Sequence, residues 1–377
     1  MWSPSVPELF HQKPSDTCSK AYHNLYEPSS EGSAQARRLC EELWRDFYDL
    51  ADSQFRNRFP DELEFHQRWF EMYLGATLRR AGLNVTAPKP GPDVRVLVDG
   101  AQIYIEAVAP TGGHPLHADA VYEPVYVDSD GTPRAVEVPS RQITLRVANA
   151  FREKADAFDG YRHKGYVGVS DPCIIAINLH DIPHAWADPQ EYWHRSLYGV
   201  GNRFIWVDQT GHAVAAGREH RAQLMRATGA KEDVAPLLDT RHAGISGVLG
   251  SAADAGNVPN PIGDDFQLMP HAAAQSPYPK GLIKRGVELV LHPVMKGQNW
   301  DIETIDYGAH ETRGPVTFSV EFEGVWHQGE WSIDGRNLSV RIKGRRLDFP
   351  IQGGDDPAAL AKENAVEMLS VSSSRHR

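Results

Sequence analysis

The chain has 377 residues, of which 41% are hydrophobic and 24% charged, enough apolar material for two or three packed domains. Its net charge of −11 excludes a protein coated with positive charge for indiscriminate binding to nucleic acid, so such binding needs a local basic surface. Three widely spaced cysteines without metal-ligand spacing favour a reducing, cytoplasmic compartment. We expect no signal peptide and, because no apolar run approaches roughly eighteen residues, no membrane span.

The first part of the chain predicts a loose arm followed by two helices. Residues 1–33 are rich in Pro, Ser and His. Residues 33–55 repeat Leu and aromatic side chains at three- and four-residue steps, which is typical of an amphipathic helix. A Pro-Asp-Glu start and a glycine after the end predict a second helix over residues 60–81. Glu64 and Glu71 lie on one face of this helix, two turns apart.

Residues 93–108, DVRVLVDGAQIYIEAV, give the strongest structural signal in the chain. Two runs alternate apolar and polar residues on either side of an Asp-Gly pair, which is typical of a tight hairpin turn. With that turn at the tip, Asp93 faces Glu106 across the hairpin. The period of two predicts that one face of the hairpin is core and carries Val94, Val96, Val98, Ala101, Ile103 and Ile105.

The same register places Asp93 and Glu106 as cross-strand neighbours on the other face. Side chains in such positions have Cβ atoms roughly 4.5–5.5 Å apart, and like charges there repel each other. A divalent cation would offset the repulsion, because carboxylate oxygens suit Mg²⁺, Mn²⁺ or Ca²⁺. A shared proton, or an arginine such as Arg95, would also offset it. The residues alone therefore leave a metal site and a structural pair open.

After the hairpin, the pattern predicts a long connection, a basic helix and a buried strand. Residues 111–140 are long enough for a lid or a substrate-contacting arm with a hairpin of its own. A helix follows Ser140, and residues 141–164 contain six basic residues against three acids. Residues 172–179 are continuously apolar, as in a central strand.

The remaining chain predicts further strands, a helix and a change of character near residue 285. Residues 203–208 and 244–249 read as strands, residues 215–238 read as a helix, and residues 251–280 show little pattern. From residue 286, short alternating strands joined by glycine turns precede a last helix, predicting a small β-meander with a covering helix. We expect three parts, namely an arm (1–33), an α/β domain (34–285) and a β-rich module (286–377).

This order of parts resembles the PD-(D/E)XK, or restriction-endonuclease-like, superfamily. The segments are FEMYLGATLRRAGLNV, GPDVRVLVDGAQIYIEAVAP and the basic helix ITLRVANAFREKADAFDGYRHKG, followed by the buried strand, within about residues 60–180. The resemblance implies an α/β fold with a central mixed sheet flanked by helices, and cleavage of phosphodiester bonds in DNA or RNA with Mg²⁺ (or Mn²⁺). It also implies that Asp93 and Glu106 hold the metal, joined by Glu71.

The chain departs from this family at Val108, where the family has a lysine. Valine can neither polarise a water molecule nor stabilise a leaving oxygen, so another lysine replaces it or the site is inactive. Lys154, beside the apolar stripe of the basic helix, is our candidate; a lysine that merely extends its ammonium into water is the structural alternative. Arg146 is a candidate phosphate contact because its planar fork suits phosphate oxygens.

Three functional hypotheses follow from the sequence. The first is a metal-dependent endonuclease that acts on nucleic acid, DNA more readily than RNA, with a C-terminal module that binds substrate, a protein partner or a second copy. The second is a catalytically inactive nuclease-fold protein that acts as a nucleic-acid-binding or assembly subunit, as Val108 favours. The third is a metal site for nucleotides or other phosphate esters. Glu64 is an alternative to Glu71, and we expect His114 and His117 to be polar loop residues.

Overall fold

The computed structural model describes residues 6–98, 100–123, 131–132, 137–207, 213–278, 286–295, 299–307, 312–322, 325–334, 337–342 and 345–350, and Ala365. The chain separates into two compact units, residues 1–290 with 297–307 and residues 291–296 with 308–377. None of the helices in the described ranges combines the length and hydrophobicity that a membrane crossing requires.

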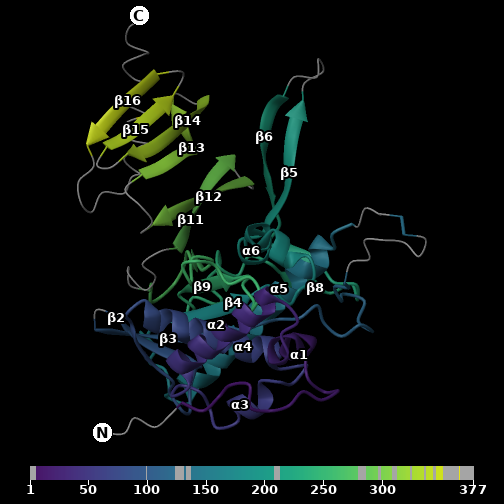
Figure 1. The fold of residues 1–377 in the computed structure, drawn as a ribbon. Coiled ribbons are helices and arrows are strands. Elements are labelled where there is room, and N and C mark those ends of the chain that lie inside the picture. The colour runs from purple at the N-terminus through teal and green to yellow at the C-terminus, as the bar shows by residue number, and fades with distance from the viewer. Residues whose placement is uncertain are drawn as a thin grey trace, which may run out of the picture. The chain divides into compact units, whose positions relative to one another are not determined.

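A mixed sheet flanked by helices forms the first unit, as expected for the α/β class (Figure 1). Parallel pairing joins β3 to β4 and β4 to β9, whereas β1/β2, β2/β3 and β9/β10 are antiparallel. Two more strands, β11 and β12, continue the sheet beyond β10. In spatial order the strands are β1 (Asn84–Thr86), β2 (Val94–Val98), β3 (Ala101–Val108), β4 (Cys173–Asn178), β9 (Gly247–Ser251), β10 (Gln267–Pro270), β11 (Gly286–Met295) and β12 (Asn299–Tyr307).

Strands β2 and β3 form the predicted hairpin in the predicted register. Val94 pairs with Ile105, and Val98 pairs with Ala101 next to the turn. Gly100 has a φ of 84°, a backbone conformation that glycine adopts without steric cost. The core face is buried as expected, although Ala101 is only half-buried. Because β2 begins at Val94, Asp93 precedes the ladder.

Four helices cover the face of the sheet that carries this core. They are α1 (Lys20–Tyr26), α2 (Glu31–Phe47), α3 (Phe55–Arg58) and α4 (Phe65–Arg80). The second predicted helix therefore begins at Phe65 rather than at residue 60, and it ends before Gly82, whose φ is 82°. Helix α4 is buried along most of its length because it lies between α2 and strands β1 and β3.

Residues 6–33 are not the loose arm that their composition predicts. They contain α1, and Leu9, Phe10 and Tyr22 are buried in the main core. The rings of Phe10 and Tyr22 lie 5.4 Å apart, and Phe10 also contacts Phe59 at 6.0 Å between centroids. A few aromatic anchors therefore outweigh a polar and proline-rich composition.

Helix α5 (Ser140–His163) packs against the other face of the sheet, on β3 and β4. Its predicted stripe of Val147, Phe151, Ala155 and Phe158 is buried. The short helix η1 (Ala185–Ala187) and helix α6 (Pro189–Leu197) follow β4, and α6 packs on α5. The sequence pattern did not reveal α6, although Pro189 at its start and the Asp188 cap are ordinary helix signals.

The helix predicted over residues 215–238 is wrong. That segment contains β6 (Ala213–His220), β7 (Gln223–Met225) and β8 (Lys231–Asp233), and β6 pairs with β5 (Val200–Val207) in an antiparallel ribbon. Pairing with β5 overrides the helix-favouring composition of β6. The hairpin expected within residues 111–140 lies largely outside the described residues.

The second unit contains the predicted β-meander from residue 312 onward. The strand expected first in that meander, near residues 288–294, is instead β11, which pairs with β10. The four strands of this unit pair with their neighbours in chain order and are all antiparallel. The expected last helix lies outside the described residues, apart from Ala365. The strands are β13 (Thr312–Phe322), β14 (Val325–Asp334), β15 (Asn337–Ile342) and β16 (Arg345–Pro350).

Candidate functional site

Asp93 and Glu106 meet where the hairpin begins and ends. The backbone N–H of Asp93 donates to Glu106 Oε2 at 3.3 Å, and Asp93 Oδ2 accepts the N–H of Ala107 at 2.8 Å. The backbone of Asp93 thus contacts the Glu106 side chain, and the Asp93 side chain contacts the backbone of the residue after Glu106. Glu106 is only 6% exposed, so its carboxylate is largely removed from water.

Helix α5 brings an ammonium group and a hydroxyl group to Glu106. Lys154 Nζ donates to Glu106 Oε1 at 3.2 Å, and the Tyr161 hydroxyl lies 3.4 Å from Oε2. The two residues are seven positions apart and so share one side of the helix. The Lys154 side chain is 18% exposed, which shows that its ammonium is directed into the protein rather than into bulk water.

Glu71 approaches Asp93 from α4, on the opposite face of the sheet. Gln67 Nε2 donates to Glu71 Oε1 at 2.8 Å, and Arg68 Nη1 donates to Glu71 Oε2 at 3.1 Å. Glu71, Asp93 and Arg68 line one pocket of about 110 Å³, to which Asp52 also contributes. Glu64, the alternative to Glu71, instead forms an ion pair with Arg68, and its side chain is more exposed than that of Glu71.

Burial and mutual repulsion hold these acids closer to the neutral form than usual. Burial and then the charge of Asp93 raise the pKa of Glu71 and of Glu106 to about 7. Burial also raises the pKa of Asp93 above its ordinary value. Burial alone would lower the pKa of Lys154, but Glu106 and Asp93 raise it, so the ammonium stays charged.

The carboxylate oxygens of the cluster are suitable ligands for a divalent cation, but the way the carboxylates are arranged is less suitable. Carboxylate oxygens are the ligands that Mg²⁺ and Mn²⁺ prefer. Within the described ranges, however, no three His, Cys, Asp or Glu side chains are grouped so that they could hold a metal ion. Asp93 accepts a backbone N–H, Glu106 contacts Lys154, and Glu71 contacts Arg68. A cation would have to compete with these internal partners.

Three residues of the cluster were missed by the sequence analysis. Besides Arg68, Gln67 ties α4 to the end of β3, because its Oε1 accepts the N–H of Ala109 at 2.9 Å. Tyr161 contacts Glu106, and burial followed by the charge of Glu106 raises its pKa to about 12. Helical spacing could have revealed two of them, since Gln67 precedes Glu71 by four residues and Tyr161 follows Lys154 by seven.

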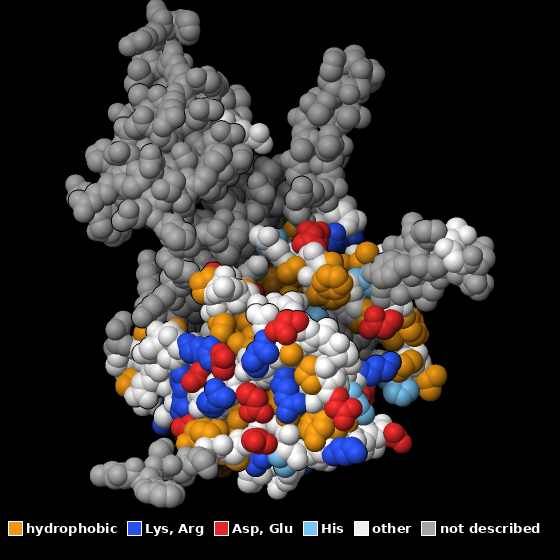
Figure 2. Space-filling model, viewed as in Figure 1, with side chains coloured by type: hydrophobic (Ala, Val, Ile, Leu, Met, Phe, Trp, Pro, Cys, Tyr) orange, Lys and Arg blue, Asp and Glu red, His pale blue; other side chains and the backbone are white. Residues whose placement is uncertain are grey.

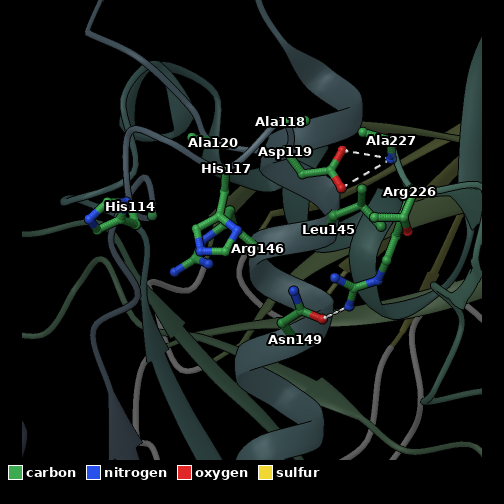
Figure 3. Close-up of a pocket in the computed structure, with 12 residues that line it drawn as sticks. His114, His117, Ala118, Asp119, Ala120, Leu145, Arg146, Asn149, Arg226 and Ala227 are labelled. Carbon is green, nitrogen blue, oxygen red and sulfur yellow. Dashed lines mark hydrogen bonds between the residues drawn. The ribbon is translucent and has the colours of Figure 1, made fainter.

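Arg146 lies apart from the carboxylates, in a second pocket of about 300 Å³ (Figure 3). Its Nε donates to the carbonyl oxygen of Thr111 at 2.9 Å. A second arginine, Arg226, lines the same pocket, together with His114 and His117. The structure thus places Asp93 next to Glu71 on one side and next to Glu106, with Lys154, on the other, whereas Arg146 lies in a separate pocket although it is on the same helix as Lys154.

The surface around α2 and α4 does not form a basic patch. On the face shown in Figure 2, Lys and Arg side chains alternate with Asp and Glu side chains among the described residues. Basic and acidic side chains of these helices and the loop after α2 also form pairs, for example Arg79 with Asp49 and Arg38 with Glu31. This face therefore offers no concentration of positive charge among the described residues.

Comparison of the chain with models of protein families, with curated proteins and with solved structures returns no match.

Proposed function

We propose that the protein is a metal-dependent nuclease with a restriction-endonuclease-like core, and that it hydrolyses phosphodiester bonds in DNA or RNA at the Asp93–Glu106 cluster. The observation that supports this most directly is the contact of Lys154 with Glu106. The resemblance calls for an ammonium beside the second carboxylate, and Val108 cannot supply one. Helix α5 supplies it through Lys154, which lies 48 residues after Glu106 in the chain.

Each residue of the cluster has a distinct role in this proposal. Asp93, Glu106 and Glu71 would hold Mg²⁺ or Mn²⁺, which supplies charge neutralisation and lowers the pKa of bound water. Lys154 places a positive charge where negative charge develops on a phosphate oxygen. Tyr161 keeps its proton and orients Glu106, and Arg68 favours the ionised form of Glu71.

A second candidate is a nuclease-fold protein that binds nucleic acid without cleaving it. The internal partners of all three carboxylates favour it, because an occupied carboxylate binds a cation less readily. This candidate predicts salt-dependent binding without turnover.

Cleavage assays with matched variants test the proposal. With Mg²⁺ or Mn²⁺, the wild type should cut plasmid, single-stranded DNA or RNA, and Asp93→Asn and Glu106→Gln should lower the rate at least about 10²–10³-fold. Glu71→Gln should also lower it, whereas Glu64→Gln, the same change on the same helix, should leave it within about twofold, as for ordinary surface changes.

Calorimetry with Mn²⁺ on the same variants separates the two candidates. Manganese binding that is lost in Asp93→Asn and accompanies cleavage supports the nuclease. Cleavage at the wild-type rate in both Asp93→Asn and Glu106→Gln would contradict the proposed site. Nucleic-acid binding with neither manganese binding nor cleavage in the folded wild type would establish the second candidate.

A further inference from the structure

The pocket beside Arg146 contains positive charge that the described protein does not neutralise. Among the described residues, Arg146 forms a hydrogen bond only to the neutral carbonyl oxygen of Thr111, and no carboxylate pairs with it there. Burial lowers the pKa of Arg146 below its ordinary value; the exposed Glu153 partly opposes this, and the charge of Arg226 adds to it. Since arginine does not lose its proton in proteins, this cost is relieved when an anion binds.

The acids around this pocket are already engaged. Asp119 accepts the N–H of Ala227 at 3.1 Å and forms an ion pair with Arg141 at 2.9 Å. Glu232, which is 5% exposed, is shared between Arg226 and Arg152. Arg141, Arg152 and Arg226 therefore share these two carboxylates, whereas Arg146 forms no ion pair within the described residues, so the excess positive charge is concentrated at Arg146.

The guanidinium groups are held in place before any ligand arrives. Arg226 Nε donates to Glu232 Oε2 at 2.8 Å, and its Nη2 donates to Asn149 Oδ1 at 2.5 Å (Figure 3). Gly113, with a φ of 94°, lies against Arg146, because a Cβ at that position would stand 3.2 Å from Arg146 Nη1. Fixed planar forks of this kind match the oxygens of a phosphate group.

We propose that this pocket binds a phosphate group of a nucleic-acid strand through Arg146 and Arg226. Its volume of about 300 Å³ is at the lower end of small-ligand sites, so it has room for more than the phosphate alone. Leu145 and Ala120, both buried, form an apolar wall that strengthens the charge interaction.

The position of the pocket favours a strand over a small phosphate compound. Arg146 and Lys154 are eight residues apart on α5 and therefore lie about 12 Å apart along its axis. A strand covers about 12 Å in roughly three to four nucleotides. One strand can thus occupy this pocket and the carboxylate cluster together. The inference rests on the proposed function only for the identity of the molecule that carries the phosphate.

Fluorescence anisotropy in EDTA tests the pocket without metal or cleavage. The probe is a short single-stranded DNA with a 3′ fluorophore, with and without a 5′-phosphate, and inorganic pyrophosphate is the competitor. We expect Arg146→Gln to weaken binding about tenfold or more, Arg226→Gln to weaken it less, and Arg146→Lys to fall between wild type and Arg146→Gln. Arg38→Gln, which removes an exposed and paired arginine of α2, should bind like the wild type.

The outcomes distinguish the sources of the phosphate and the failure of the proposal. Stronger binding of the 5′-phosphorylated probe, lost in Arg146→Gln, assigns the pocket to a strand end. Equal binding of both probes, weakened by Arg146→Gln, assigns it to a backbone phosphate. Two results would overturn the inference. One is that Arg146→Gln and Arg38→Gln bind the probe with equal affinity. The other is that pyrophosphate displaces the probe from Arg146→Gln as well as it does from the wild type. A protein that binds in EDTA but never cleaves refutes the nuclease and leaves the pocket standing.

Discussion

Glu106 is a buried acid whose protonation connects stability to the proposed chemistry. Burial and the charge of Asp93 favour its neutral form, whereas Lys154 favours its ionised form, and the balance raises its pKa to about 7. In the unfolded chain a glutamate titrates near pH 4.3. Between these two values the folded protein therefore binds more protons than the unfolded chain.

This difference gives the sign of a stability change with pH. The proton-linked stability is fully present below about pH 4 and is lost as the pH rises through 7. Glu106→Gln resembles the protonated acid and does not titrate. From pH 5 to pH 8, the wild type should lose about 1–3 kcal/mol of unfolding free energy relative to Glu106→Gln, measured by urea denaturation in EDTA.

The comparison with Glu106→Gln removes the titration of groups that do not interact with Glu106. His66, whose pKa is lowered to about 4 by burial and then His180, titrates equally in both proteins. Mg²⁺ should stabilise the wild type more at pH 8 than at pH 5, because deprotonated carboxylates bind it better. If the free energies of unfolding of the two proteins change equally with pH, the pKa of Glu106 is not raised in the folded state.

At the scale of elements, α5 supplies Glu106 with the ammonium group that the proposed nuclease site needs and that Val108 of β3 cannot provide. Val108 is half-buried two residues after Glu106 on the same side of the strand, and Lys154 reaches Glu106 from the helix that covers that side. The charge is thus supplied by packing of a helix on a sheet rather than by strand geometry. A lysine introduced at position 108 should therefore be able to replace the ammonium group of Lys154.

Lys154→Met should lower the cleavage rate about 10²–10³-fold, because it keeps the aliphatic stem but removes the charge. Adding Val108→Lys to Lys154→Met should restore at least about tenfold of this loss. Single-turnover cleavage assays with saturating Mn²⁺ measure both effects. Val108→Lys in the wild-type background is the control for damage to β3.

Two results would argue against this role for Lys154. One is a Lys154→Met variant that is folded and cleaves at the wild-type rate. The other is a Lys154→Met loss that Val108→Lys leaves unchanged while Val108→Lys alone is fully active. The second result would mean that Lys154 acts by positioning the Glu106 side chain, a role that a lysine at position 108 cannot take over.

The hairpin and its two acids could be predicted because the sequence pattern that specifies them lies within one short segment. The alternation of Val94, Val96 and Val98 and the turn glycine define both faces and the register. Asp93 and Glu106 then follow by counting. Lys154 could be named as a candidate because it borders the buried stripe of α5, but its contact with Glu106 depends on how α5 packs on β3.

The second pocket could not be predicted because it depends on a distant segment. Arg226 lies between β7 and β8, in a stretch whose composition favours a helix, and it reaches α5 across 77 residues of sequence through Asn149. No spacing or motif connects the two positions. Likewise, the aromatic contacts that pack residues 6–33 on the core join residues far apart in sequence.

For the whole molecule, the net charge of −11 limits how a polyanion can bind. Basic and acidic side chains alternate on the face shown in Figure 2. The pocket lined by Arg146 and Arg226 contains one guanidinium group, that of Arg146, without a carboxylate partner among the described residues. Binding should then displace few counterions, since each neutralised phosphate contributes about 0.9 to the salt slope on duplex DNA and about 0.7 on a single strand.

The affinity for single-stranded DNA should therefore depend only moderately on salt. With about two to three phosphates neutralised, a rise from 50 to 200 mM KCl should weaken binding roughly 7- to 20-fold, against roughly 300-fold or more for a protein with six or more phosphate contacts on a single strand. Anisotropy titrations in EDTA at several KCl concentrations measure the slope. Arg146→Gln should reduce its magnitude by about 0.7, because one phosphate contact is removed, whereas Arg38→Gln should leave it unchanged. A steep slope in the wild type that Arg146→Gln does not alter would instead place nucleic-acid binding on an extended basic surface away from this pocket.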